Sequence, residues 1–330
     1  MKYSMARRRP DESDIRIRPP RSTRPRSKDR PSHKDSVSAI VVTVDRGRTL
    51  CRTDKGVLVN SMKARELGKN SVVVGDQVNL VGDTSGAEGS LARIVGVQPR
   101  RNSLSRTIDD AGAFEKTIAA NIDQMIIVAA SANPEPRHGF IDRCLPVAYD
   151  QGIVPIIVMT KSDLNNPEDF LRAYDALDVK SFAIQRGGDL RDIQAALQNK
   201  SSVLIGHSGV GKSTLVNALL GETHRATGDV NDATGRGRHT SSSAIAFELP
   251  SGGTIIDTPG VRSFGLEHID KSRVISSFEE LGRAIARCPK NCSHDEEMCA
   301  LNDYVLEHPE RKLRVESLRR LLASSSQPLI

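Results

Sequence analysis

The stretch GHSGVGKST, residues 206–214, constrains the fold of this 330-residue chain more than any other feature. It matches the pattern GxxxxGK[ST], it follows the apolar run SSVLIG, and it leads into the amphipathic segment KSTLVNALLG. A glycine-rich turn between a strand and a helix wraps its amides around phosphates, while its lysine reaches the β- and γ-oxygens and its hydroxyl reaches Mg²⁺. We therefore expect a nucleotide-binding α/β domain, with Lys212 in catalysis and Ser213 on Mg²⁺. The expected phosphate-binding residues are Gly206, His207, Ser208, Gly209, Val210, Gly211, Lys212, Ser213 and Thr214.

A second motif, GGTIIDTPG (residues 252–260), places a DxxG pattern at the end of an apolar run. We expect Asp257 to hold Mg²⁺ through water and the Gly260 amide to sense the γ-phosphate. The segment between the two motifs, TGDVNDATGRGRHTSSS (227–243), is polar and has no apolar periodicity. It is typical of a switch that orders around phosphate and Mg²⁺. Thr240 is the expected catalytic and magnesium-binding threonine of this switch, with Ser241 as the alternative.

The residue after DxxG is Val261, where GTPases of the Ras type place a glutamine that orients water. An apolar side chain cannot polarise water, so we expect slow hydrolysis unless another group substitutes. His239, next to Thr240, is the candidate catalytic group, because imidazole can orient or deprotonate a water near neutral pH. The alternative is an ordinary surface histidine in a loop.

The motif that reads the base lies on the unexpected side of the phosphate loop. Ras-type GTPases carry an [NT]KxD tetrad downstream of that loop, yet no lysine from Thr214 to Ile330 has an aspartate two residues later. Lys161 is the one lysine in the chain that does, in MTKSDL at the end of the apolar run GIVPIIVMT. The Asp163 carboxylate can accept from the N1–H and N2–H₂ groups of guanine together, which adenine cannot offer. We expect guanine to be bound by Thr160, Lys161, Ser162 and Asp163, which implies a circularly permuted GTPase domain.

Two regions of the chain differ in their pattern of apolar residues. Short β-type runs separated by Gly, Asp, Asn and Ser fill residues 37–97, which predicts a small barrel such as an OB-fold. Because residues 37–110 contain no Phe, Tyr or Trp, backbone or shape recognition of nucleic acid is favoured over base stacking, and a purely structural barrel is the alternative. From Ala119 onward, near-continuous apolar runs alternate with amphipathic segments, as in a doubly wound sheet.

The net charge of +6 is concentrated in the first 36 residues, where 12 Lys and Arg stand against 5 Asp and Glu. This segment has too few large apolar residues to fold alone. It is typical of an electrostatic arm for RNA phosphates. The alternatives are a solubilising extension or a transit peptide, and the five acidic residues argue against the latter. The apolar runs are too short to span a bilayer, and no secretory h-region is present, so we expect a cytoplasmic protein with no membrane partner.

A cluster of thiols and one imidazole lies near the C-terminus. Cys288, Cys292, His294 and Cys299 fall within twelve residues and form a Cys₃His set. Such a set binds one Zn²⁺ tetrahedrally with no open position, hence structurally, and buried free thiols are the alternative. Cys51 and Cys144 stand alone and read as packing residues. The last helical segment, ERKLRVESLRRLLASS, is expected to place Leu313, Leu318, Leu321 and Leu322 on its apolar side.

These motifs in this order resemble the RsgA/YjeQ family of ribosome small-subunit biogenesis GTPases. The resemblance rests on RRNSLSR, TKSD, GHSGVGKST, GRGRHTS, DTPGV and CPKNCSHDEEMC. It implies GTP hydrolysis stimulated by the small ribosomal subunit, a role in late maturation of that subunit, and a switch histidine that acts in place of the glutamine, here His239. The sequence departs from the family at Thr160, where Asn is usual, in the loop FAIQRGG (182–188), and in a zinc motif one residue tighter at both gaps.

The predicted fold is α/β: a circularly permuted P-loop GTPase domain (108–266) between an N-terminal OB-fold β-barrel (37–107) and a C-terminal helical zinc-binding domain (267–330), preceded by a disordered basic tail (1–36). The expected partners are GTP or GDP, the small (30S) ribosomal subunit and its rRNA; the expected cofactors are one Zn²⁺ and a Mg²⁺ bound with GTP; and the expected state is a monomer. The alternatives are a permuted GTPase that acts on another ribosomal particle, and an RNA-binding protein with a relic nucleotide site.

Overall fold

The N-terminal part of the described chain forms a closed five-stranded barrel. This computed structural model describes residues 35–45, 47–68, 71–107, 115–221, 244–258 and 269–324. The strands pair in the order β1-β2-β3-β5-β4 and close through β1–β4, with β3 and β5 parallel. A buried apolar set that includes Val41, Cys51 and Val59 fills the interior. The predicted OB-fold barrel is confirmed, and it consists of β1 (Val37–Asp45), β2 (Arg48–Thr53), β3 (Leu58–Lys63), β4 (Gln77–Gly82) and β5 (Ala92–Val97), with the 3-10 turn η2 (Arg65–Leu67) after β3.

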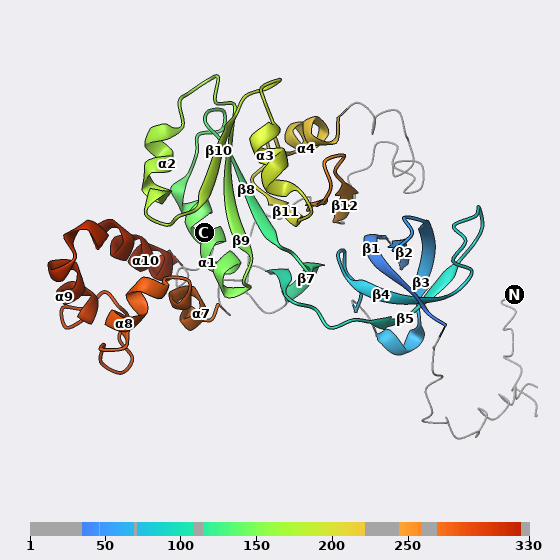
Figure 1. Ribbon diagram of the computed structural model, residues 1–330, viewed down its shortest axis with the longest axis horizontal. Coiled ribbons are helices and arrows are strands. Elements are labelled where there is room, and N and C mark those ends of the chain that lie inside the picture. Colours follow the sequence, from blue (N-terminus) through green and yellow to red (C-terminus); the bar gives the residue numbers. More distant parts are fainter. Residues whose placement is uncertain are drawn as a thin grey trace, which may run out of the picture. The chain divides into compact units, whose positions relative to one another are not determined.

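The second body is built on a mostly parallel sheet in the order β10-β9-β8-β11-β13-β12, in which only β12 is antiparallel to its neighbour β13 (Figure 1). The three strands on one side of β11 precede it in sequence, and the two on the other side follow it. This is the predicted circular permutation, and it is confirmed. The strands are β8 (Gln124–Ala130), β9 (Val154–Thr160), β10 (Lys180–Ile184), β11 (Ser201–Ile205), β12 (Ile245–Glu248) and β13 (Thr254–Asp257).

Helices cover both faces of this sheet, as the nearly continuous apolar strands require. Every residue of β8 is buried, and two separate apolar clusters flank the sheet. One cluster takes in side chains of α1 (His138–Asp150) and α2 (Glu168–Asp175), and the other those of α3 (Arg191–Leu197) and α4 (Lys212–Leu220). Pro146 lies inside α1 without ending it. No helix in the described ranges is both long and apolar enough to cross a membrane.

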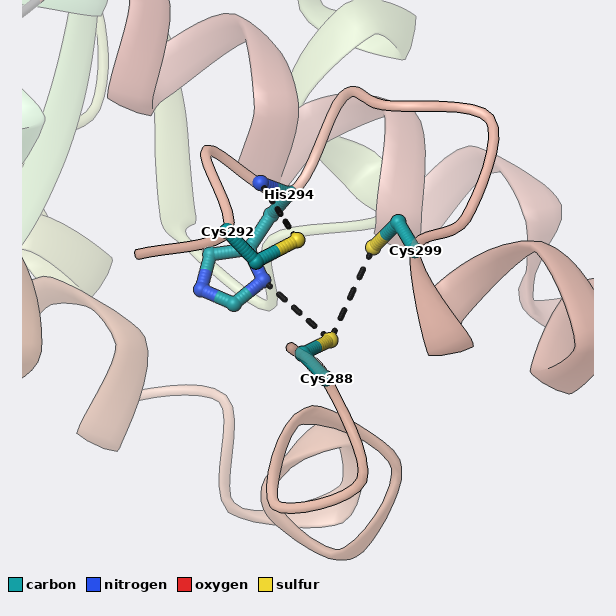
Figure 2. A group of neighbouring side chains, drawn as sticks. All are labelled: Cys288, Cys292, His294 and Cys299. Carbon is teal, nitrogen blue, oxygen red and sulfur yellow. Dashed lines mark hydrogen bonds between the residues drawn. The ribbon is translucent and has the colours of Figure 1, made fainter. Parts of the chain in front are cut away.

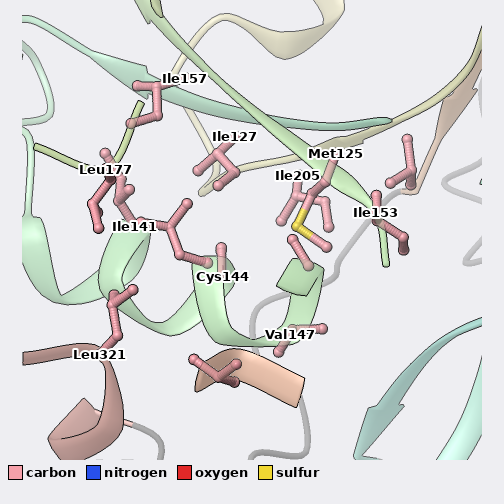
Figure 3. Close-up of a cluster of buried hydrophobic side chains, with 14 of the residues drawn as sticks. Met125, Ile127, Ile141, Cys144, Val147, Ile153, Ile157, Leu177, Ile205 and Leu321 are labelled. Atoms are coloured by element: carbon pink, nitrogen blue, oxygen red, sulfur yellow. The ribbon is translucent and has the colours of Figure 1, made fainter. Parts of the chain in front are cut away.

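The C-terminal region is helical and packs on α1. It consists of α7 (Lys271–Ser276), η3 (Glu279–Leu281), α8 (Gly282–Ile285), α9 (Ala300–Glu307), η4 (Pro309–Arg311) and α10 (Lys312–Ser324). Figure 3 shows α1 between the strand residues Met125 and Ile127 and Leu321 of α10, all in one buried cluster. The Arg314 guanidinium of α10 donates to the Ala176 carbonyl and to Glu280, each at 2.6 Å. The last helix therefore fastens the C-terminal region to the sheet domain.

One predicted apolar position on this helix is wrong. Leu313 is 66% exposed, whereas Val315, Leu318, Leu321 and Leu322 are buried. At about 100° per residue, the buried stripe centres on the opposite side of the helix from Leu313. The predicted buried positions Leu318, Leu321 and Leu322 are confirmed, but Leu313 lies in the first turn and faces away.

A hairpin and a short turn join the barrel to the sheet domain. The hairpin pairs β6 (Ser103–Thr107) with β7 (Glu115–Ala120). The Ala120 amide donates to the Val74 carbonyl at 2.9 Å, and the Asn121 amide group donates to the Gly75 carbonyl at 3.0 Å. Arg100 donates from Nε and Nη2 to the two oxygens of the buried Asp76 carboxylate, at 2.7 and 2.8 Å. Two arginines of the RRNSLSR segment are thus engaged in this junction, because Arg101 also pairs with Asp123 at 2.9 Å.

Replacing Gly75 with alanine should weaken the junction. Gly75 has φ +87°, and a Cβ there would lie 2.2 Å from the Ala120 carbonyl oxygen, so backbone must move. Gly56 has a similar φ of +79° but open space around it, so Gly56→Ala carries the conformational cost without the clash. We expect Gly75→Ala to lower the free energy of unfolding by about 2 kcal/mol more than Gly56→Ala in urea titrations. Equal losses in the two variants would contradict the steric account.

Candidate functional site

The phosphate loop occupies residues 206–211, between the end of β11 and the start of α4. Gly209 and Gly211 adopt φ of +81° and +88°, the left-handed region in which a side chain is strained. A Cβ on Gly206 would lie 2.4 Å from the Val128 carbonyl oxygen of β8. The three glycines are therefore required by local geometry, two for their backbone conformation and one for close approach to the neighbouring strand.

The lysine of the GxxxxGK[ST] pattern and the aspartate of DxxG both lie near this loop. Lys212 donates from Nζ to the carbonyl oxygens of Gly206 at 2.5 Å and His207 at 2.7 Å. Burial lowers the pKa of Lys212, while the charge of Asp257 raises it. Asp257 ends β13 directly opposite Leu204 of the strand that feeds the loop. The Thr258 hydroxyl donates to the Leu204 carbonyl at 2.8 Å, which holds the ends of these two paired strands together.

The base motif lies against the same loop although it comes from another strand. Thr160 ends β9, and its hydroxyl donates to the Val210 carbonyl at 2.6 Å. Lys161, at φ +56°, donates from Nζ to the Gly209 carbonyl at 3.0 Å and to the Asn133 carbonyl. The threonine that stands where asparagine is usual thus retains a short hydrogen bond to the phosphate loop. The Asn133 carbonyl was missed at the sequence level, because no local pattern marks a backbone acceptor.

A cavity of about 250 Å³ lies between the base motif and helix α4. Its third wall is the turn that follows β10, in which the Gly188 amide donates to the Gln185 carbonyl at 3.1 Å. This turn is the second half of FAIQRGG, so that segment borders the cavity beside the base motif. The Asp163 side chain is exposed, two residues beyond the lining residue Lys161. The lining residues are Thr160, Lys161, Ile184, Gln185, Arg186, Gly187, Gly188, Leu190, Gly211, Thr214, Leu215 and Ala218.

Three predicted site residues lie outside the described residues. These are His239 and Thr240 of the expected switch, and Gly260 of DxxG; Ser241, the alternative to Thr240, lies outside them as well. Their assigned roles stay predictions. Among the described residues, Thr160 and Lys161 each bond to a carbonyl of the same loop to which Lys212 bonds.

The Cys₃His cluster predicted from spacing is assembled in space (Figure 2). The four potential ligand atoms of Cys288, Cys292, His294 and Cys299 all lie within 4.8 Å of one another. Cys288 Sγ lies 3.8 Å from Cys299 Sγ and 3.6 Å from His294 Nδ1. Tetrahedral Zn²⁺ bonds of about 2.3 Å to sulfur and about 2.0 Å to nitrogen require separations of about 3.8 and 3.5 Å. The donor set and these two edges therefore fit zinc despite the tight spacing.

Hydrogen bonds from Arg319 of α10 hold the loop that carries these four residues. Arg319 donates from Nε to the His294 carbonyl at 2.7 Å and from a terminal nitrogen to Asn302 at 2.6 Å. Burial raises the pKa of the Cys292 thiol to about 11 and lowers that of His294. Neutral imidazole is the form that binds a metal, and a bound cation would offset the cost of ionising the thiols. Arg319 was missed from the sequence because it lies 25 residues from His294 and reads as a surface charge.

The other two cysteines behave as packing residues. Cys51 is fully buried in the barrel, where its Sγ lies 3.3 Å from the Ser61 hydroxyl. Burial raises the pKa of Cys51 to about 11, and burial also raises the pKa of Cys144, a buried residue of α1. Both thiols are kept protonated and away from solvent, which makes them poor ligands or nucleophiles.

Comparison with known proteins finds a family model and relatives whose descriptions all include RsgA. A family model described as RsgA GTPase matches residues 97–267. A protein named small ribosomal subunit biogenesis GTPase RsgA from Shewanella oneidensis is 39% identical over 284 residues, 82% of this chain and 79% of its own. One of the same name from Azotobacter vinelandii is 36% identical over 268 residues, 78% of this chain and 76% of its own.

Solved structures show the same fold. YjeQ from Thermotoga maritima superposes with a TM-score of 0.64 at 24% identity, covering 87% of this chain and 98% of that one. YloQ, described as a circularly permuted GTPase, gives 0.63 at 20% identity, covering 92% and 100%.

The Thr160 hydroxyl should be needed to hold the phosphate loop. Thr160→Val keeps the shape of the side chain but leaves the buried Val210 carbonyl without its donor, at a cost of about 1–3 kcal/mol. We expect GDP to dissociate roughly 5-fold to 100-fold faster in stopped-flow measurements with fluorescent GDP. Thr160→Ser is the matched control, because it retains the hydroxyl and should keep the slow rate. Identical rates for Val and Thr at this position would show that the bond is dispensable.

Proposed function

Since the chain belongs to the RsgA GTPase family, we propose that it hydrolyses GTP as a late maturation factor of the small ribosomal subunit. The observation that carries the proposal is the contact between Thr160 and Val210. It brings a TKSD segment and a phosphate loop, in reversed sequence order, to the two sides of one cavity. A relic of a nucleotide site would have no reason to keep Lys212, Ser213 and Asp257 alongside this arrangement.

The described residues bind and orient the nucleotide in the proposed mechanism. Asp163 accepts hydrogen bonds from guanine N1–H and N2–H₂, and the Lys161 stem covers the base. The turn 185–188 lines the same cavity, so its backbone is proposed to contact the guanine O6. The amides of residues 208–212 cradle the phosphates, and Lys212 exchanges its carbonyl partners for β- and γ-oxygens.

Ser213, Asp257 and Thr240 are the residues proposed to hold Mg²⁺. When bound, this cation neutralises negative charge between the β- and γ-phosphates. The position of Asp257 opposite Leu204, next to the strand that feeds the loop, supports its role. Val261 cannot orient water, so His239 is proposed to do so.

The C-terminal cluster is proposed to hold one structural Zn²⁺, since four protein ligands leave no open coordination position. The barrel, this zinc domain and the basic tail are proposed to contact rRNA, with the chain acting as a cytoplasmic monomer. Lys63 of the barrel and Arg100 of the junction that follows it are occupied by internal hydrogen bonds. The exposed side chains of Lys55, Arg65 and Arg93 make no ion pair within the described ranges, so RNA phosphates are better matched to these.

Turnover with ribosomal particles tests the function directly. Phosphate release from GTP should rise at least about tenfold when purified small subunits are added, and large subunits should not replace them. His239→Ala should bind GTP as tightly as the parent chain but lose stimulated turnover by roughly 10²-fold or more. Stimulation by large subunits alone would point to another particle. Absence of turnover under every condition would end the enzyme proposal.

Metal content tests the zinc assignment. The purified chain should carry about one zinc per molecule, and Cys292→Ala should remove most of it because a four-ligand site loses one donor. Cys51→Ala, which also removes a thiol but lies in the barrel core, is the matched control and should retain the metal. Equal zinc in Cys292→Ala and the parent chain, measured by atomic absorption, would refute the site.

A further inference from the structure

The barrel and the nucleotide site share one hydrogen-bonded sheet. Strand β12 would be the edge of the parallel sheet, but its outer side pairs with β1 of the barrel. The register places Thr43 of β1 opposite Ile245, Ile245 opposite Asp257, and Asp257 opposite Leu204. The aspartate proposed to hold Mg²⁺ is therefore only two strands away from the barrel, along a single row of paired residues.

The hairpin between them is short. Strands β12 and β13 contain four residues each, and β13 also pairs with β11, so β12 is the strand whose second neighbour comes from the barrel. The row through Ile245 and Asp257 fixes one end of the hairpin. Glu248, at the other end, pairs with Thr254 and also forms an ion pair with Arg52 of barrel strand β2, with 2.5 Å between Nη1 and Oε1. Both ends of β12 are thus held by the barrel.

The Arg52–Glu248 pair is better placed than an ordinary surface ion pair. The Arg52 side chain is 18% exposed and Glu248 is 57% exposed, so one partner is largely shielded from water. Arg52 itself is set in the ladder between Ile40 and Leu58, so its backbone is fixed by both neighbouring strands. A short contact from a fixed strand restricts where the β12–β13 hairpin can lie.

We propose that Arg52 is a positioning residue of the nucleotide site: through Glu248 and the β1–β12 pairing, the barrel sets the position of Asp257 and thereby the affinity for Mg²⁺. This inference rests on the proposed function, in which Asp257 holds Mg²⁺. It gives the barrel a second role besides binding RNA. A ligand that shifts β1 or β2 acts on the magnesium site without touching the nucleotide.

Charge reversal in the full-length chain tests the inference. The readout is the Mg²⁺ concentration that halves the dissociation rate of fluorescent GDP, which requires no turnover. Arg52→Glu should raise this concentration about threefold to tenfold, the range expected for loss and reversal of a partly exposed pair. The double variant Arg52→Glu with Glu248→Arg should return it to within about twofold of the parent. Arg48→Glu is the matched control, because Arg48 lies on the same strand, is exposed, and makes no ion pair with the described residues.

The outcomes separate this inference from the function on which it rests. If Arg52→Glu melts at a lower temperature but keeps the parent Mg²⁺ midpoint, the pair is only structural and the inference is overturned. Failure of the double variant to restore the midpoint would likewise overturn it. If the parent chain itself binds GDP without any dependence on Mg²⁺, the magnesium assignment of Asp257 fails, and this inference fails with it.

Discussion

The hydrogen bond from the Thr160 hydroxyl to the Val210 carbonyl joins two segments that are 50 residues apart in sequence. It exists because β9 and β11 run parallel on either side of β8, so the residues after each strand emerge at the same edge of the sheet. The chain order of the two motifs does not matter to this geometry. A permuted sequence can therefore build the same kind of nucleotide cavity, provided that the strand order in space is kept.

The local parts of the site were predictable from sequence. A phosphate loop needs glycines at defined positions between a strand and a helix, and Gly206, Gly209 and Gly211 are indeed needed there for sterics or backbone conformation. The cysteine cluster was predictable for the same reason, since its ligands are close in sequence. The barrel and the doubly wound sheet followed from strand spacing and apolar runs. His239, Thr240 and Gly260 stay predictions.

The long-range contacts were not predictable from one sequence. Nothing local marks Arg100 as the partner of Asp76, Arg319 as the support of the metal loop, or Arg52 as the partner of Glu248. The sequence assigned a partner to none of these arginines. Leu313 shows the opposite error, because an apolar residue was assigned to a buried stripe that begins at Val315 and faces away from it. Partners are set by tertiary packing, which composition and periodicity do not encode.

The central claim is that Asp163, upstream of the phosphate loop, reads guanine in the cavity bordered by Thr160 and residues 185–188. The most direct test is competition of GDP, ADP and xanthosine diphosphate against fluorescent GDP, for the parent chain and for Asp163→Asn. The account predicts that the parent chain prefers GDP strongly over both others, and that Asp163→Asn loses GDP affinity while gaining affinity for xanthosine diphosphate, whose O2 accepts from the new amide. An unchanged preference in Asp163→Asn would contradict it.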